Sequence, residues 1–194
     1  MACSNPGVYH PRMHVTRLEL KNFRGLVQAA IDFSTPVTVL VGRNGAGKTA
    51  VLEALVGSLR RIECLLRTET GEDLGANGSD VGHRFATQDI SNDWIHTEVQ
   101  ASAVVGQTVT WSATLQRRGM DLAGPSWADD NLVMAIHDVR SGLLARSGEE
   151  IPLAVYYPAD RTRLDLPERA RPRHVFAQLA AWDGSLNGEG ETRF

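Results

Sequence analysis

One eight-residue pattern constrains this chain more than any other feature, the glycine-rich run GRNGAGKT at residues 42–49. It follows an almost wholly apolar run at 37–41 and precedes a segment, starting at Lys48, in which apolar residues recur every three or four positions. The first run predicts a strand buried on both faces, and the second predicts an amphipathic helix. A strand, a glycine-rich loop and a helix in this order predict an α/β fold.

The pattern matches GxxxxGK[ST], whose geometry suits phosphate. Glycines let successive backbone N–H groups converge on phosphate oxygens, and the helix start adds the positive end of its dipole. Lys48 is expected to reach the β- and γ-phosphates of ATP, and the Thr49 hydroxyl to hold Mg²⁺. We therefore predict ATP and Mg²⁺ as cofactors. The predicted binding residues of the loop are Gly42, Arg43, Asn44, Gly45, Ala46, Gly47, Lys48 and Thr49.

A glycine turn with an incidental lysine is the competing interpretation of the loop. Chance expects roughly 0.002 matches to this motif in a chain of this composition. Of the 20 Lys and Arg residues, Lys21 and Lys48 are the two lysines. Lysine therefore stands at the position where a compact ammonium is needed and a planar guanidinium would not fit.

Periodicity predicts further strands and helices along the chain. On the helix after the loop, Glu53, Ser58, Arg60, Arg61 and Glu63 are expected on the solvent face, opposite the apolar stripe. The predicted elements are strands at 13–20, 26–33 and 151–157, the first two antiparallel, a hairpin of 94–105 and 108–116, helices at 48–67, 128–145 and 174–182, and a long loop at 68–92.

The stretches RLELKNFRG (17–25) and VLVGRNGAGKTAVLEAL (39–55) together resemble the N-terminal lobe of the RecF/SMC/OLD-type ABC ATPases. The resemblance implies a P-loop NTPase of ABC type, whose N-terminal lobe has a mixed sheet, a P-loop helix and an antiparallel β-hairpin region. It also implies that Arg24 of the NFRG turn lies near the nucleotide phosphates, and that Asn44 shapes the loop and faces the site of a partner subunit. A plain solvent-exposed turn arginine remains the alternative for Arg24.

Three later segments are similar to parts of the bacterial PtuA-like anti-phage defence ATPases, large "AAA family" proteins of systems such as Septu and some retrons. These segments are QDI at 88–90, LAVYYPADR at 153–161 and WDGSL at 182–186. The resemblance implies an effector nuclease as a candidate partner. It makes Arg161 either a nucleotide-sensing residue or a surface arginine.

The sequence shows no counterpart of the second half of an ABC catalytic site. A Walker B strand ending in Asp-Glu, a signature motif near LSGGQ and a switch histidine are all missing. The nearest Walker B imitation ends at Asp160, which no glutamate follows, and Gln88 and Gln178 are weak candidates for a Q-loop. Catalytic residues are therefore unassigned. We expect an N-terminal tail at 1–12 and an incomplete lobe at 13–194, with a second ATPase subunit or a missing C-terminal lobe as partner.

The formal net charge of −3 at pH 7 argues against a surface that attracts nucleic acid all over. The densest basic stretch, 161–174, is either a solvated surface or a contact to a DNA backbone, so DNA is a candidate partner. We expect no membrane partner and a cytoplasmic protein, since the sequence has no apolar run of about 18 residues and no secretory signal.

Three functions fit the pattern. The first is the ATP-binding lobe of an ABC-type ATPase that, when complete and dimerised, hydrolyses ATP to control a DNA-related or anti-phage defence effector. The second is a non-catalytic ATP-binding module that gates a protein partner. The third, a self-contained kinase or small NTPase, is disfavoured by the missing Walker B strand. We expect this chain alone to hydrolyse ATP poorly or not at all.

Overall fold

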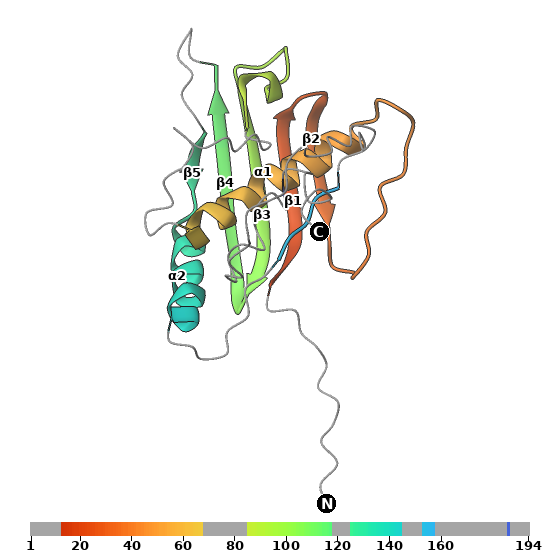
Figure 1. Ribbon diagram of the computed structural model, residues 1–194. Coiled ribbons are helices and arrows are strands. Elements are labelled where there is room, and N and C mark those ends of the chain that lie inside the picture. Colours follow the sequence, from red (N-terminus) through yellow and green to blue (C-terminus); the bar gives the residue numbers. More distant parts are fainter. Residues whose placement is uncertain (1–12, 68–84, 118–124, 145–152, 158–185, 187–194) are drawn as a thin grey trace, which may run out of the picture.

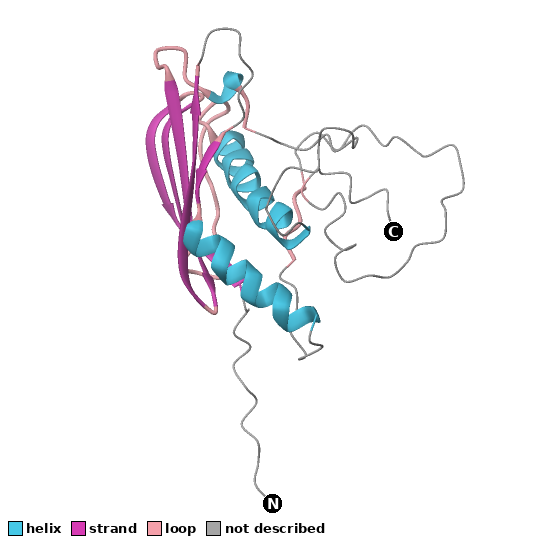
Figure 2. Ribbon diagram, turned by 90° about the vertical axis from the view of Figure 1, so that its left-hand side faces the viewer, coloured by secondary structure: helices cyan, strands magenta, loops and turns pink. Residues whose placement is uncertain are grey.

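The computed structural model describes residues 13–67, 85–117, 125–144, 153–157 and 186. It contains a five-stranded sheet with two helices on one face (Figures 1 and 2). In chain order the elements are β1 (Met13–Phe23), β2 (Leu26–Asp32), α1 (Lys48–Arg67), the 3₁₀ turn η1 (Thr87–Asp89), β3 (His96–Val105), β4 (Gln107–Gln116), β5 (Ser126–Ala128) and α2 (Asp130–Leu144). The strands lie in the order β2-β1-β3-β4-β5.

Alternation of apolar and polar residues places one face of the sheet against the helices. Every second residue of β3 is buried, and β3 pairs with β4 over its whole length, from His96 opposite Gln116 to Val105 opposite Gln107. Gly106 turns the hairpin with a φ of 69°, in the left-handed region that glycine adopts without strain. The predicted hairpin and the antiparallel pair of first strands are confirmed.

Helix α1 runs over the predicted residues, but its predicted solvent face is wrong. The apolar stripe is buried as expected, yet Ser58, Arg60 and Glu63 on the other side are buried too. A helix in contact with structure on more than one side has no fully solvated face, so the simple two-sided pattern fails. On the sheet side, the indole N–H of Trp111 from β4 donates to the carbonyl of Ser58 at 3.2 Å.

Gly57 lies where α1 closely approaches Phe85, which precedes η1. A Cβ at this position would lie 2.7 Å from Cε1 of Phe85. The Phe85 ring has little room to retreat, because it packs edge-on against Phe23 at 6.0 Å and against Trp127 at 6.1 Å. Glycine therefore lowers helix propensity here in exchange for close packing, which explains a residue that looks unfavourable in the sequence alone.

An ion pair ties α1 to the start of α2. Nε of Arg61 donates to Oδ2 of Asp129, and the guanidinium lies 5.5 Å from the ring centre of Trp127 in β5. The carbonyl of Asp129 also accepts the N–H of Val133 at 2.9 Å, in the first turn of α2. Helix α2, predicted at 128–145, is confirmed and packs against β4 and α1.

The predicted strand at 37–41 is wrong in this structure. The segment forms no strand, and Val37, Val39 and Val41 expose 75%, 74% and 89% of their surface. A strand buried on both faces needs neighbours that satisfy its backbone groups and cover its side chains. Within the described ranges no segment pairs with it, and all pairings there are antiparallel, so the parallel part of a mixed sheet is not seen.

The second apolar run behaves in the same way. Residues 153–157 of the predicted strand at 151–157 form no strand, and Leu153, Val155 and Tyr157 are exposed while Tyr156 is buried. The predicted helix at 174–182, most of the long loop at 68–92, and the basic stretch at 161–174 lie outside the described residues. In the part of the chain that the structure describes, no helix is both long enough and apolar enough to cross a lipid bilayer.

Candidate functional site

The glycine-rich loop connects the exposed segment 37–41 to α1 and curls back on itself. Gly45 and Gly47 have φ angles of 81° and 88°, which side chains other than glycine rarely adopt. The Ala46 N–H donates to the carbonyl of Arg43 at 3.2 Å, and a Cβ on Gly42 would lie 3.2 Å from that of Ala46. The glycines are therefore required by the shape of the loop.

Lys48, the first residue of α1, folds its side chain over the loop. Its Nζ donates to the carbonyl of Gly42 at 2.9 Å and to that of Arg43 at 2.7 Å. The ammonium thus lies where the loop curls and where the first N–H groups of the helix have no intrahelical acceptor. A phosphate placed there would meet a charged donor, backbone N–H groups and the positive helix end together.

The remaining loop residues that were predicted to bind nucleotide are open to solvent. Arg43, Asn44 and Ala46 are exposed, as is Thr49 in the first turn of α1. Thr49 follows Lys48 directly, so its hydroxyl is at the same helix end as the ammonium. These four residues are accessible to a ligand, and their assignment to ATP and Mg²⁺ is part of the proposal below.

The turn between β1 and β2 packs against the end of the loop. A Cβ on Gly47 would lie 2.9 Å from Cδ2 of Leu26, the first residue of β2. Arg24, two positions earlier, has a φ of 51°, which is uncommon and strained for a residue with a side chain. Its N–H donates to the carbonyl of Asp89 at 2.7 Å, which holds this backbone conformation.

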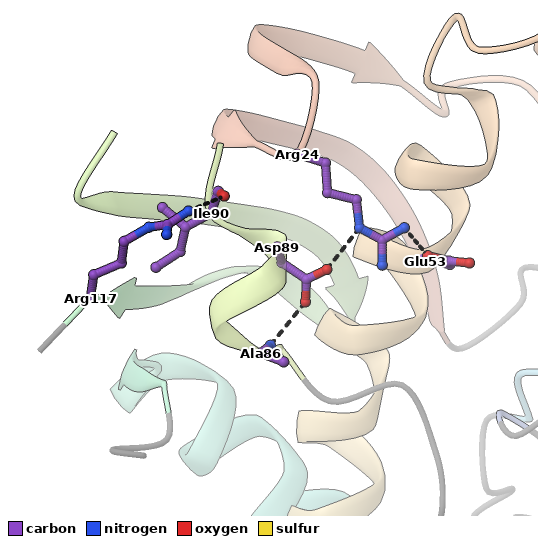
Figure 3. Close-up of polar contacts among 6 residues, drawn as sticks. All are labelled: Arg24, Glu53, Ala86, Asp89, Ile90 and Arg117. Atoms are coloured by element: carbon purple, nitrogen blue, oxygen red, sulfur yellow. Dashed lines mark hydrogen bonds and ion pairs between the residues drawn. The ribbon is translucent and has the colours of Figure 1, made fainter. Parts of the chain in front are cut away.

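The Arg24 side chain bridges two carboxylates from distant parts of the chain (Figure 3). Its Nε donates to Oδ1 of Asp89 in η1 at 2.7 Å, and its Nη1 donates to Oε2 of Glu53 in α1. The other oxygen of Asp89 accepts the N–H of Ala86 at 2.9 Å. The guanidinium also lies 5.4 Å from the centre of the Phe23 ring. Arg24 is thus half-buried and paired, rather than a free turn arginine.

Burial and the charges of this cluster raise the pKa values of two of its groups, Arg24 and Tyr156. Burial lowers the pKa of Arg24, but hydrogen bonds and charge from Asp89 and Glu53 outweigh it and the pKa is raised. Burial raises the pKa of Tyr156, the charge of Glu53 raises it further, and that of Arg24 lowers it. Tyr156 of the segment 153–157 therefore lies within electrostatic reach of the Arg24 cluster.

Sequence reasoning singled out Arg24 and the loop as site residues but did not single out the two carboxylates that contact Arg24. Glu53 was assigned to a solvent face of α1, and Asp89 stands beside Gln88, which was weighed as a Q-loop residue and is exposed in η1. The short distance in space between positions 24, 53 and 89 has no signal in one sequence. Asp160, Arg161 and Gln178 lie outside the described residues.

The motif, the glycine conformations and the lysine at the helix start define a P-loop, the phosphate-binding loop of nucleotide-binding proteins. A family model described as "AAA domain" (AAA_23) matches residues 17–181. This chain belongs to that family. The matched range contains the loop, Arg24, Glu53 and Asp89.

Curated relatives agree with this placement. The chain is 30% identical over 119 residues to the DNA replication and repair protein RecF of Bifidobacterium longum subsp. infantis, a match that covers 57% of this chain and 23% of the relative. It is 40% identical over 43 residues to RecF of Francisella tularensis subsp. novicida, covering 22% and 12%. The matches thus span less than a quarter of these relatives.

Two solved structures are also similar to this chain. One is described as the recombination mediator protein RecF bound to ATP (18% identity, TM-score 0.36, covering 54% of this chain and 24% of that one). The other comes from work on ATP-driven dimerization and DNA-stimulated activation of SMC ATPases (17% identity, TM-score 0.41, covering 72% and 93%).

Proposed function

We propose that this chain is the ATP-binding lobe of an ABC-type ATPase, formed by residues 13–194, and that it hydrolyses ATP only together with a second catalytic half. The observation that carries the proposal is the loop geometry, in which Lys48 and the left-handed Gly45 and Gly47 stand at the open start of α1. Phosphates of ATP would replace the two loop carbonyls as partners of the ammonium, and Thr49 would hold Mg²⁺.

The exposed apolar segment before the loop supports a second half. Val37, Val39 and Val41 alternate along a segment that leads straight into the loop, and they are exposed although valine favours buried strands. A neighbouring strand from a C-terminal lobe or a second ATPase subunit would satisfy this backbone and cover these side chains. A companion of this kind would also bring the acidic and signature residues that the sequence lacks.

The role of the complete protein is proposed from its relatives. The curated RecF proteins are described as DNA replication and repair proteins. We propose that the complete, dimerised ATPase controls a DNA-related or anti-phage defence effector, with DNA or an effector nuclease as partner, in the cytoplasm. The alternative is a non-catalytic module in which ATP binding gates a protein partner, which the missing Walker B carboxylates favour.

The rate of ATP hydrolysis by this chain alone distinguishes an incomplete lobe from a self-contained enzyme. We expect it to bind Mg·ATP and to release phosphate far more slowly than about 1 s⁻¹, the low end of usual enzyme rates. Phosphate release should be followed with purified chain over a range of protein concentrations, with Lys48→Ala as the background. Sustained turnover near that rate, abolished by Lys48→Ala, would show a complete catalytic site and contradict the proposal.

A further inference from the structure

Leu26, the first residue of β2, lies against the phosphate loop at Gly47. A Cβ on Gly47 would lie 2.9, 3.2 and 3.4 Å from Cδ2, Cγ and Cδ1 of Leu26, so the end of the leucine side chain covers one side of this glycine. Among the described residues, a Cβ on Gly42 would meet Ala46 of the same loop, and one on Gly45 would meet nothing within 4 Å. Gly47 is therefore the glycine through which the loop packs against β2.

Gly47 also marks the point where the loop becomes helix. Its φ of 88° lies in the left-handed region, and its carbonyl accepts the N–H of Val51 at 3.0 Å, the first hydrogen bond of α1. Residues 42–46 before it are exposed, whereas Gly47 and Lys48 are partly buried. A side chain that fixes Gly47 therefore fixes both the end of the loop and the first turn of the helix, whose free N–H groups can bind phosphate.

The hairpin that carries Leu26 holds it firmly in place. Leu26 pairs with Phe23 across the turn between β1 and β2, and Phe23 is 1% exposed and forms a β-bridge with Ile90. In the same turn, the N–H of Arg24 donates to the carbonyl of Asp89 at 2.7 Å. Leu26 therefore gives a well-anchored support to a loop that is otherwise exposed.

We propose that Leu26 is a positioning residue of the nucleotide site, which holds Gly47 and the start of α1 in the shape that binds phosphate. Leu26 acts on the loop and does not touch the nucleotide. Without this support the loop is ordered only when phosphate binds, so the loss of backbone entropy opposes binding. The inference rests on the proposed function, since it names a residue that prepares the same site for its ligand.

The test is the affinity of the 194-residue chain for Mg·ATP and for Mg·tripolyphosphate, measured by calorimetric titration. Leu26→Ala should weaken both about five- to tenfold, because ordering about one backbone residue then opposes binding. Leu26→Met, whose side chain has a similar volume, should bind both ligands within about twofold of the wild type. Equal losses for the two ligands place the effect at the phosphates that they share, whereas a contact with the nucleoside would weaken ATP alone.

Ile31→Ala is the matched control for a general loss of packing. Ile31 is another partly buried apolar residue of β2, opposite Leu18 and about 16 Å along the strand from Leu26. Ile31→Ala should lower the thermal stability and leave both affinities within about twofold of the wild type. In the free chain, NMR relaxation at the amides of Gly45 and Gly47 should show more backbone motion in Leu26→Ala than in Ile31→Ala.

A second variant covers the case in which Leu26→Ala does not fold, as judged by thermal unfolding. Leu26→Val keeps a residue that favours strands but has a shorter side chain, and it should weaken both ligands about two- to threefold. If the wild type binds tripolyphosphate too weakly to measure, the relaxation of the free chain decides, and unchanged motion at Gly47 overturns the inference.

The outcomes distinguish the role of Leu26 from the function on which it rests. Wild-type affinity in a folded Leu26→Ala chain, or an equal loss in Ile31→Ala, overturns the role of Leu26 and leaves the proposed function intact if Lys48→Ala still weakens binding. A loss of affinity for Mg·ATP alone, with tripolyphosphate bound as tightly as before, also overturns it. A folded wild-type chain that binds neither ligand overturns both.

Discussion

Replacing Lys48 by alanine is expected to weaken Mg·ATP binding by about 100-fold, equivalent to ~3 kcal/mol. The ammonium of Lys48 is the charged donor of the loop, and it already lies over the loop carbonyls of Gly42 and Arg43. Phosphate is a stronger partner than these two carbonyls, so removing the ammonium leaves anionic oxygens without their main counter-charge. Binding should be measured by equilibrium titration with a fluorescent ATP analogue and with ATP itself.

The chain supplies a matched control in its other lysine. Lys21 lies in β1 and pairs with Glu98 at 2.8 Å, on an exposed part of the sheet, and Lys21→Ala removes the same charge. ATP affinity should stay within about twofold of the wild type in this variant, since exposed ion pairs contribute little and the site is elsewhere. Wild-type ATP affinity in the Lys48→Ala variant would show that the loop does not bind the phosphates of ATP.

Replacing Trp111 by alanine is expected to lower the free energy of unfolding by about 3–5 kcal/mol. Trp111 is 1% exposed, stands opposite Ala101 in the sheet, and donates its indole N–H to the carbonyl of Ser58 in α1. The variant therefore loses buried apolar surface and leaves a cavity between the sheet and the helix that begins at the nucleotide loop. Urea unfolding followed by circular dichroism measures the loss.

Trp94 provides the comparison for this substitution. It precedes β3 and is 43% exposed, so Trp94→Ala should change the free energy of unfolding by less than about 1 kcal/mol. The loss expected for Trp111→Ala, in contrast, can exceed a third of the stability of a typical domain. In that variant α1 should become disordered together with the sheet. Equal unfolding midpoints for the two variants would show that the helix does not depend on this contact.

Features that arise from neighbouring residues could be predicted from the sequence. The alternation in β1 to β4 and the three- to four-residue recurrence in α1 and α2 reflect burial on one face of each element. This periodicity is visible in the order of residues along the chain. The glycines and the lysine of the loop belong to one motif of eight consecutive residues whose geometry suits phosphate, so they could be picked out from the sequence. Arg24 was predicted by resemblance to lie near the nucleotide phosphates, and that role stays a prediction. The structure shows that its turn lies next to the loop, with Leu26 close to Gly47.

Features that need distant partners could not be predicted. The segment 37–41 reads as a buried strand, but strand formation depends on a neighbour, and none of the described residues provides one. Glu53 looks like a solvent-face residue until η1 brings Asp89 to the other side of Arg24. The burial of Ser58, Arg60 and Glu63 has the same origin, since it depends on what packs over α1 from elsewhere.

The most direct test of the account is an NMR titration of the folded wild-type chain with Mg·ATP, followed at the backbone amides. We expect saturable binding, with the largest shifts at Gly45, Gly47, Lys48 and Thr49, and much weaker effects with adenosine, which has no phosphate for the loop to bind. Binding of ATP that leaves these amides unshifted, or equal shifts with adenosine, would contradict a phosphate-binding role for the loop.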